Sequence, residues 1–236
     1  MTQRYIRALL KISGEALGGD RDYGLDPVKT GWIAREIVSA VQDDCQVGIV
    51  VGGGNILRGA DASAVGVPQL VGDHMGMIAT ALNALALQWA LKGAGKPAVV
   101  MSSFPIGRFV ETFEREKALD YLDKGFITIF AGGTGNPCFT TDSAAALRAV
   151  EIVADVMIKC TQVDGVFDKD PNKYHDAVFI EQINPEDIVT RRLKIVDAAC
   201  ADILSTRKIP AIVLNLHKEG NLRRALAGEQ VGTVIA

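Results

Sequence analysis

Apolar runs of strand length alternate with longer segments of helical spacing along almost the whole chain. The strand-like runs cover residues 7–12, 47–51, 98–101, 126–131, 156–160, 211–214 and 233–235. The helix-like segments cover residues 30–43, 75–92, 111–124, 143–153, 194–207 and 221–226. This alternation predicts an α/β protein, a three-layer α/β/α sandwich around a mainly parallel central sheet. A functional site in such a sheet is expected beyond the carboxyl ends of the strands.

Length and composition indicate one ordinary globular domain spanning residues 1–236. Hydrophobic residues make up 48% and charged residues 22%, which excludes a disordered chain. A net charge of −3 gives no reason to expect nucleic acid or an acidic membrane as a partner. No uninterrupted apolar segment has the length of a membrane span, and the first residues lack a signal-peptide pattern. Four widely spaced cysteines argue against a disulfide framework or zinc site, so we expect a cytoplasmic protein.

Residues 132–146 carry the strongest functional signal. Here an apolar run ends in glycines, crosses several hydroxyl residues and leads into a helix-like segment. Glycines before a helix start expose backbone N–H groups to an anion such as phosphate. Thr140 or Thr141 is expected to cap the helix, with Asp142 in its first turn. By itself, the stretch fits a capped strand-to-helix turn equally well.

Two lysines inside apolar runs and a glycine triplet favour the phosphate interpretation. Lys11 and Lys159 occupy strand-like runs, where an unpaired ammonium is costly to bury. Each either meets a polyphosphate at the strand end or extends from a sheet edge into solvent. Residues 52–54 are all glycine, and Arg58 follows them with a guanidinium suited to phosphate oxygens. Neither the Walker spacing nor a complete dinucleotide fingerprint occurs in these loops.

Several acidic residues and one aromatic residue fit either a structural role or a role in ligand binding. Asp73 either caps the helix-like segment that follows or accepts hydrogen bonds from ribose hydroxyls. Asp164 and Asp170 precede glycine and proline, as turn-forming residues do. Phe167 either flanks a purine ring or fills the core.

The motifs together resemble the amino-acid kinase superfamily, and within it the bacterial uridylate kinases. They are K-I-S-G-E at 11–15, the glycine triplet, V-G-D-H-M-G-M at 71–77, G-T-G-N-P-C-F-T-T-D-S-A-A at 133–145 and the segment 159–171. The resemblance extends from the first strand-like run to the last. It implies transfer of the γ-phosphoryl group of ATP to UMP, with Mg²⁺ on the ATP phosphates and no direct protein ligand for the metal.

The resemblance also assigns site residues. The implied catalytic residues are Lys11, Arg58, Asp142 and Lys159. The implied ATP site consists of Lys11, Ile12, Ser13, Gly14, Gly54, Arg58, Thr161, Phe167 and Asp170, with Asp164 close by. The implied UMP site consists of Gly53, Asp73, Thr134, Gly135, Asn136, Pro137, Cys138, Phe139, Thr140 and Thr141. The N-terminal part would mainly bind UMP and form oligomer contacts, and the C-terminal part would mainly bind ATP.

The resemblance further implies a homohexamer that UTP inhibits and GTP activates. The chain carries Gln88, Trp89 and Lys92 where enterobacterial relatives have residues associated with GTP activation. Cys138 replaces an aromatic residue that is common after Asn-Pro. Both departures bear on how the chain would treat its nucleotides.

Three other functions remain open at this stage. One is a kinase for a carboxylate or carbamate, which the motifs around Asp73 and residues 134–142 disfavour. A second is a nucleotide sensor without turnover, which the full set of charged residues disfavours. The third is a dinucleotide-dependent oxidoreductase, which lacks its glycine fingerprint here.

Overall fold

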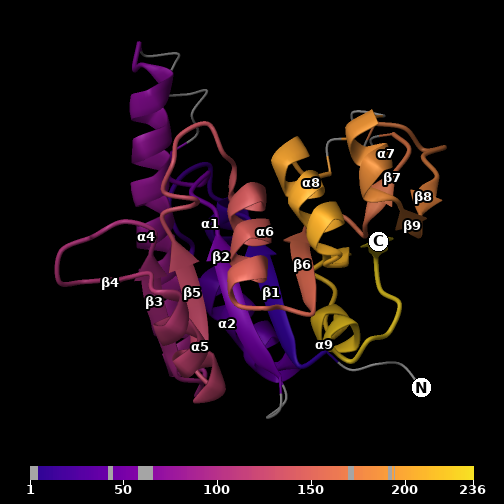
Figure 1. Ribbon diagram of the computed structural model, residues 1–236. Helices are drawn as coiled ribbons and strands as arrows, with labels where there is room; N and C mark the ends of the chain where they lie inside the picture. The colour runs from indigo at the N-terminus through magenta and orange to yellow at the C-terminus, as the bar shows by residue number, and fades with distance from the viewer. Residues whose placement is uncertain (1–4, 42–44, 58–65, 170–172, 191–192, 194) are drawn as a thin grey trace.

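The computed structural model describes residues 5–41, 45–57, 66–169, 173–190, 193 and 195–236 (Figure 1). Arg58 and Asp170, two of the implied site residues, lie outside these ranges. The strands are β1 Arg7–Ile12, β2 Gln46–Val51, β3 Ala98–Ser102, β4 Glu111–Thr112, β5 Ile127–Ala131, β6 Val156–Thr161, β7 Val166–Phe167, β8 Phe179–Ile180, β9 Gln182–Ile183, β10 Ala211–Asn215 and β11 Thr233–Ile235. The helices are α1 Gly14–Gly18, α2 Pro27–Ala40, α4 Gln69–Gly93, α5 Arg115–Asp123, α6 Thr141–Glu151, α7 Pro185–Thr190, α8 Ala198–Arg207 and α9 Asn221–Leu226.

The main sheet has the order β4-β3-β5-β2-β1-β6-β10-β11-β9. All its neighbouring strands run parallel except β10 and β11, and β7 and β8 form a separate antiparallel pair. The chain first builds the sheet on one side of β1, through β2, β3 and β5, and then places β6 on the other side. The strand order therefore reverses between β1 and β6, and ligands of open α/β sheets bind in the crevice beyond such a reversal.

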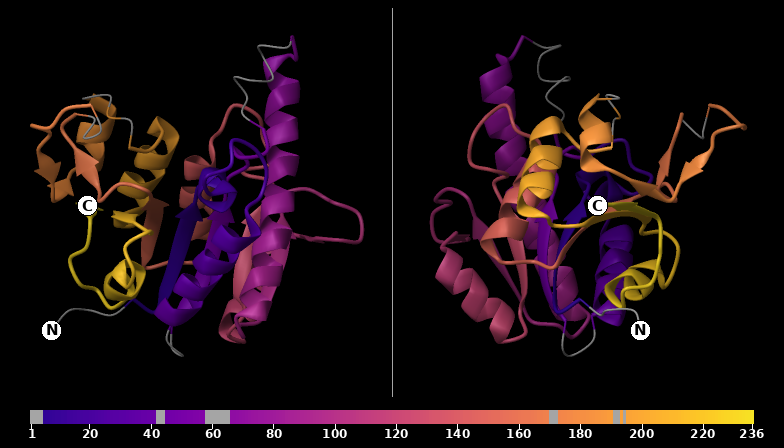
Figure 2. Two further views of the ribbon diagram at one scale, coloured as in Figure 1. Left: turned by 180° about the vertical axis from the view of Figure 1, so that it is seen from behind. Right: turned by 45° about the vertical axis from the view of Figure 1, so that its right-hand side comes forward.

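Helices cover both faces of the sheet, which confirms the predicted three-layer sandwich (Figures 1 and 2). One buried cluster joins the sheet to α2, α4 and α9, and a second joins the opposite face to α5, α6 and α8. Alternate residues of a strand enter opposite clusters: Leu10 and Ile12 belong to the first, and Leu9 to the second. By the same alternation, Lys11 and Lys159 face the layer that contains α6 and α8.

The central strands lie within a residue or two of their predicted positions, whereas several helix boundaries differ. The helix expected over 111–124 begins at Arg115, because Glu111–Thr112 pairs with β3. The helix expected over 194–207 begins at Ala198, because Asp197 is its N-cap and accepts from Cys200 N at 2.8 Å. The short elements α1, α7, β4, β7, β8 and β9 were not predicted, since each is too brief for a periodic pattern.

Helix α4 differs most from its prediction. It begins at Gln69 rather than at residue 75, and its N-terminal part extends beyond the sheet (Figure 2). By length and composition alone α4 could cross a membrane, a test that core helices of soluble proteins also pass. One of its faces packs on β3 and β5. Its other face exposes apolar side chains, namely Leu70, Val71, Met75, Ile78, Leu82 and Trp89.

Candidate active site

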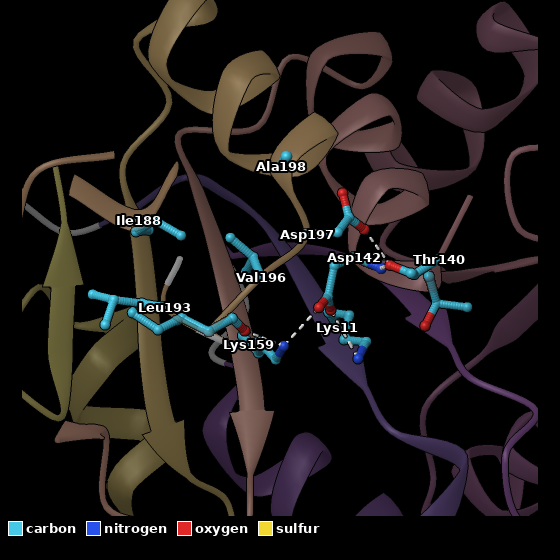
Figure 3. A pocket seen from close by; sticks show the side chains of 11 residues that line it. Lys11, Thr140, Asp142, Lys159, Ile188, Leu193, Val196, Asp197 and Ala198 are labelled. Atoms are coloured by element: carbon cyan, nitrogen blue, oxygen red, sulfur yellow. Dashed lines mark hydrogen bonds and ion pairs between the residues drawn. The ribbon is translucent and has the colours of Figure 1, made fainter. Parts of the chain in front are cut away.

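Lys11 and Lys159 lie side by side at the carboxyl edge of the sheet. They are direct partners in the β1–β6 register, and both side chains point to the layer that contains α6 (Figure 3). Asp142, in the first turn of α6, bridges them: its Oδ1 is 2.8 Å from Lys11 Nζ and its Oδ2 is 2.6 Å from Lys159 Nζ. The three side chains are only 11–16% exposed. The ammonium groups are therefore paired, which removes the main cost of burying them.

The start of α6 is fixed from two sides. Thr140 is the N-cap, and its hydroxyl accepts from Asp142 N at 3.0 Å, which decides between the two predicted caps. The Thr140 hydroxyl also donates to Asp197, the N-cap of α8. Asp197 further accepts from Ser143 Oγ at 2.6 Å and from Ser143 N at 3.2 Å. Burial alone would raise the pKa of Asp197, but the hydrogen bonds from Ser143, Thr140 and Cys200 outweigh it and lower this pKa below its ordinary value.

A cavity of about 470 Å³ opens above the lysine pair. Lys11, Asp142 and Lys159 form its charged side, and the segment between α7 and α8 contributes an aliphatic wall (Figure 3). The Ile195 carbonyl in that segment accepts a hydrogen bond from Lys159 Nζ. The cavity thus combines a pair of cations, suited to a polyanion, with an apolar surface.

A second cavity of about 370 Å³ adjoins the first. It is bounded by α4, by the loop after β2 and by the loop that precedes α6. The implied acceptor residues that line it are Gly53, Asp73, Thr134, Asn136, Phe139, Thr140 and Thr141. Thr140 and Thr141 line both cavities, so a group bound in one lies next to a group bound in the other.

Asp73 lies inside α4 and is not its N-cap, so the interpretation of Asp73 as a helix cap was wrong. Its Oδ2 accepts from Cys138 N at 2.8 Å, which ties α4 to the loop before α6. Cys138 has a left-handed backbone, with φ of 69°, and an exposed side chain. The peptide N–H of residue 138 makes this link, so the cysteine side chain takes no part in it.

The glycine triplet has two distinct physical roles. A Cβ on Gly53 would lie 2.7 Å from Gly76 O, and a Cβ on Gly52 would lie 2.9 Å from Gly14 N, so both allow close backbone packing. A Cβ on Gly54 would meet nothing nearer than 3.8 Å. Gly54 lines the second cavity and also a third, of about 520 Å³, beside α1. Of the three, Gly54 is thus the one whose open side faces the cavities.

Thr161 and Phe167, the implied donor-nucleoside residues that the structure describes, line neither of the first two cavities. Thr161 Oγ1 is 2.8 Å from Val163 O, within the turn that follows β6. Phe167 packs edge-to-face on Phe179 in the β7–β8 pair, with ring centroids 5.4 Å apart. Asp164 accepts from Lys218 Nζ at 2.8 Å and from Asn215 Nδ2 at 3.1 Å, and these two bonds lower its pKa. Phe167 therefore packs on another ring at the β7–β8 pair rather than in either core cluster, and Asp164 contacts residues more than 50 positions away.

Ile12, Ser13 and Gly14 connect β1 to α1, next to the lysine pair. Ile12 is fully buried, so its backbone is what it offers to a ligand. Ser13 is the residue before α1, and Gly14 packs against the glycine triplet. Among the described residues, no group of three or more His, Cys, Asp or Glu side chains is placed to hold a metal ion.

Sequence reasoning missed Asp197 and Ser103, which contact the loops of the site, and Arg148, which contacts Ser103. An aspartate before the small-residue run at 198–201 is an N-cap signal that would have identified Asp197. Nothing local marks Ser103 or Arg148, because their partners are distant in the sequence.

A mainly parallel sheet with paired cations at its strand-order reversal defines a class of α/β proteins that bind anionic ligands at the carboxyl edge. The model of the amino acid kinase family matches residues 7–215, and the chain belongs to this family. Proteins described as uridylate kinase from Xanthomonas euvesicatoria pv. vesicatoria and Xanthomonas oryzae pv. oryzae are each 48% identical to it over 231 residues. These matches cover 98% of this chain and 96% of each relative.

Solved structures agree with this assignment. The crystal structure of UMP kinase from Bacillus anthracis has a TM-score of 0.95 and 36% identity, covering 99% of this chain and 96% of its own. UMP kinase from Ureaplasma parvum has a TM-score of 0.91 and 32% identity, covering 99% and 100%. Uridylate kinase from Archaeoglobus fulgidus is less similar, with a TM-score of 0.73 and 31% identity, covering 97% and 99%.

Proposed function

We propose that this chain transfers the γ-phosphoryl group of ATP to UMP, giving UDP and ADP. The observation that carries the proposal is the pair of lysines held by Asp142 where two cavities meet. One cavity contains two lysine ammonium groups that can contact a polyphosphate, and the other is formed by the motifs that resemble a UMP site. Relatives named uridylate kinase and UMP kinase match nearly the whole chain.

The proposed chemistry needs positioning and charge neutralisation. A phosphate oxygen of UMP is itself the attacking group, so no strong protein base is required. Lys11 and Lys159 would neutralise the transferring phosphoryl group, and Asp142 would hold both ammonium groups at a fixed separation. Arg58, which we also assign to transfer, lies outside the described residues.

We assign the donor ATP to Lys11, Ile12, Ser13, Gly14, Gly54, Thr161, Phe167 and, outside the described residues, Arg58 and Asp170. We assign UMP to the ten residues from Gly53 to Thr141 named above. Mg²⁺ would travel on the ATP phosphates, since the Asp142 carboxylate already has two lysine partners. Its chemistry would be to offset the negative charge of the phosphate oxygens.

A panel assay separates this proposal from its competitors. ADP release would be measured with MgATP and one acceptor at a time: UMP, CMP, AMP, acetylglutamate or carbamate. We expect turnover with UMP. Turnover with acetylglutamate or carbamate alone would favour the carboxylate and carbamate kinases, and binding of UMP without turnover would favour a sensor.

Lys11→Ala tests the assigned role of Lys11. We expect kcat to fall far more than UMP affinity, because Lys11 faces the donor cavity. Lys124→Ala removes an exposed lysine that pairs with Asp120, and this control should leave both unchanged. Equal losses of kcat and UMP affinity in Lys11→Ala would contradict the assignment.

We further propose a cytoplasmic homohexamer that works as one domain, with UTP as feedback inhibitor and GTP as activator. The exposed apolar face of α4 supports self-association, because a patch of that kind favours burial against another surface. UTP would compete for the UMP cavity. Gel filtration with and without GTP, together with UMP saturation curves at several UTP concentrations, would test assembly and regulation separately.

A further inference from the structure

The loop that leads from β5 into the proposed UMP cavity has an unusual backbone. Three of its first four residues, Gly132, Gly133 and Gly135, have positive φ values of 79°, 58° and 81°. Gly133 and Thr134 line the UMP cavity. Glycines in this region have large conformational freedom in the absence of restraints. The shape of the cavity therefore depends on contacts that hold residues 132–135, which we call the acceptor loop.

Two side chains from other elements hold the acceptor loop. The hydroxyl of Thr80, on α4, accepts from Gly132 N at 2.7 Å. The hydroxyl of Ser103, just after β3, donates to Gly133 O at 2.6 Å. A Cβ on Gly135 would lie 3.2 Å from Ser103 Cβ, so Ser103 also packs against the loop. Together they restrain the loop on either side of the Gly132–Gly133 peptide.

Ser103 is in turn held by Arg148 of α6. Arg148 is only 4% exposed, and its Nη2 donates to Ser103 Oγ at 2.9 Å. The serine oxygen accepts this bond, and of the two carbonyls near its own proton, Gly133 O at 2.6 Å is closer than Ala131 O at 3.3 Å. The guanidinium carbon lies 3.8 Å from the centre of the Phe113 ring, and Glu151 forms an ion pair with the same side chain. Arg148 thus has a fixed orientation.

Stability alone gives little reason for a buried arginine here. Hydrophobic residues of similar volume often replace buried ion pairs without loss of stability. The buried Arg148 Nε has no hydrogen-bond partner in the described part of the chain, so the arrangement also leaves a polar group unsatisfied. Departures of this kind from the most stable arrangement are expected near functional sites.

We propose that Arg148 and Ser103 are positioning residues that set the acceptor loop for UMP binding without taking part in phosphoryl transfer. This inference rests on the proposed function. Neither residue lines the cavity over the lysine pair, and both act on the loop through the Gly133 carbonyl. Their removal therefore changes KM for UMP while kcat and KM for ATP stay close to those of the unmodified protein.

Ser103→Ala is the first test. Loss of one hydrogen bond worth about 1 kcal/mol corresponds to about a fivefold rise in KM for UMP. Calorimetric titration with UMP alone should give the same fivefold loss of affinity, and kcat and KM for ATP should change less than twofold. Thr128→Val is the matched control, because Thr128 is a fully buried hydroxyl of β5 outside the acceptor loop. Thr128→Val should leave kcat, KM for UMP and KM for ATP unchanged.

Arg148→Met tests whether the two residues act in series. Methionine fills much of the same space, and the Glu151 side chain, 28% exposed, can be solvated without its partner. If the two residues act in series, the double variant Ser103→Ala/Arg148→Met has the same KM for UMP as the more affected single variant. Independent action would multiply the two effects. If Arg148→Met fails to fold, Ser103→Ala alone decides.

Different outcomes overturn different claims. If the unmodified protein does not phosphorylate UMP, the proposed function fails. If it does, but Ser103→Ala leaves KM for UMP unchanged, the positioning role fails while the proposed function stands. Equal increases of KM for UMP and for ATP in Ser103→Ala would likewise overturn the positioning role, since they would indicate a general loss of structure.

Discussion

Asp142→Asn is the substitution with the largest expected effect. It removes the negative charge between two lysine ammonium groups that lie 2.8 Å and 2.6 Å from the carboxylate oxygens. Removing one partner from a buried ion pair costs about 3–5 kcal/mol. The asparagine amide keeps one oxygen that can accept from a lysine, so we expect the lower end, about 3 kcal/mol. With a urea m-value of about 3 kcal/mol/M, the unfolding midpoint should fall by about 1 M.

Asp120→Asn is the matched control for this effect. Asp120 also lies 2.6 Å from a lysine Nζ, that of Lys124, but both side chains are more than half exposed. An exposed helical pair of this spacing contributes about 0.3–0.5 kcal/mol. Urea unfolding of both variants would be followed by tryptophan fluorescence at one fixed protein concentration, because association affects apparent stability.

Activity gives the second measurement. With its two cations no longer held together, the Asp142→Asn protein should lose about 100-fold in kcat, the scale found when one preorganised electrostatic group is removed. An Asp142→Asn protein no less stable than Asp120→Asn would refute the view that Asp142 neutralises a buried cation pair. A fully active Asp142→Asn protein would refute its role in holding that pair for transfer.

Three further predictions concern neighbouring contacts. Gly53→Ala should destabilise the protein by about 1–3 kcal/mol because its Cβ meets Gly76 O and Ala79, whereas Gly54→Ala should leave the melting temperature unchanged and raise KM for nucleotide. Asp197→Ala should cost about 2 kcal/mol at pH 7, with exposed Asp202→Ala as a neutral control. The folded-state pKa of Asp197 is lowered, so its stabilising contribution is present above the ordinary value of 3.8 and is lost as pH falls through the lowered pKa. Urea unfolding at pH 3 should therefore show a smaller stability difference between Asp197→Ala and the unmodified protein than at pH 7. Thr128→Val should raise stability by about 1 kcal/mol, measured as melting temperature, because its buried hydroxyl has no hydrogen-bond partner among the described residues; a lower melting temperature would contradict this.

The central sheet could be predicted because its strands are buried on both faces and read as continuous apolar runs. Apolar runs such as residues 7–12 and 156–160 are buried on both sides when they lie inside a sheet that helices cover. Short elements escaped prediction because tertiary pairing creates them: β4 is two exposed residues that pair with β3. Helix starts were misplaced where the cap went unrecognised, as at Asp197.

The charged centre of the site was predictable and its supports were not. Lys11 and Lys159 were conspicuous because lysine is rare within apolar runs, and Asp142 followed from its motif. Their mutual contacts, which depend on strand register and on α6, required the structure. Ser103 and Arg148 belong to no sequence pattern, since 45 positions separate them along the chain.

The pairing of Lys11 with Lys159 has a consequence for how the chain folds. Residues 148 positions apart place two like charges opposite each other on neighbouring strands, an arrangement that by itself opposes pairing. The Asp142 carboxylate of α6 offsets this repulsion by pairing with both ammonium groups. The stability of the β1–β6 junction is therefore coupled to the docking of α6. The centre of the sheet and the start of α6 should therefore lose their structure together on unfolding.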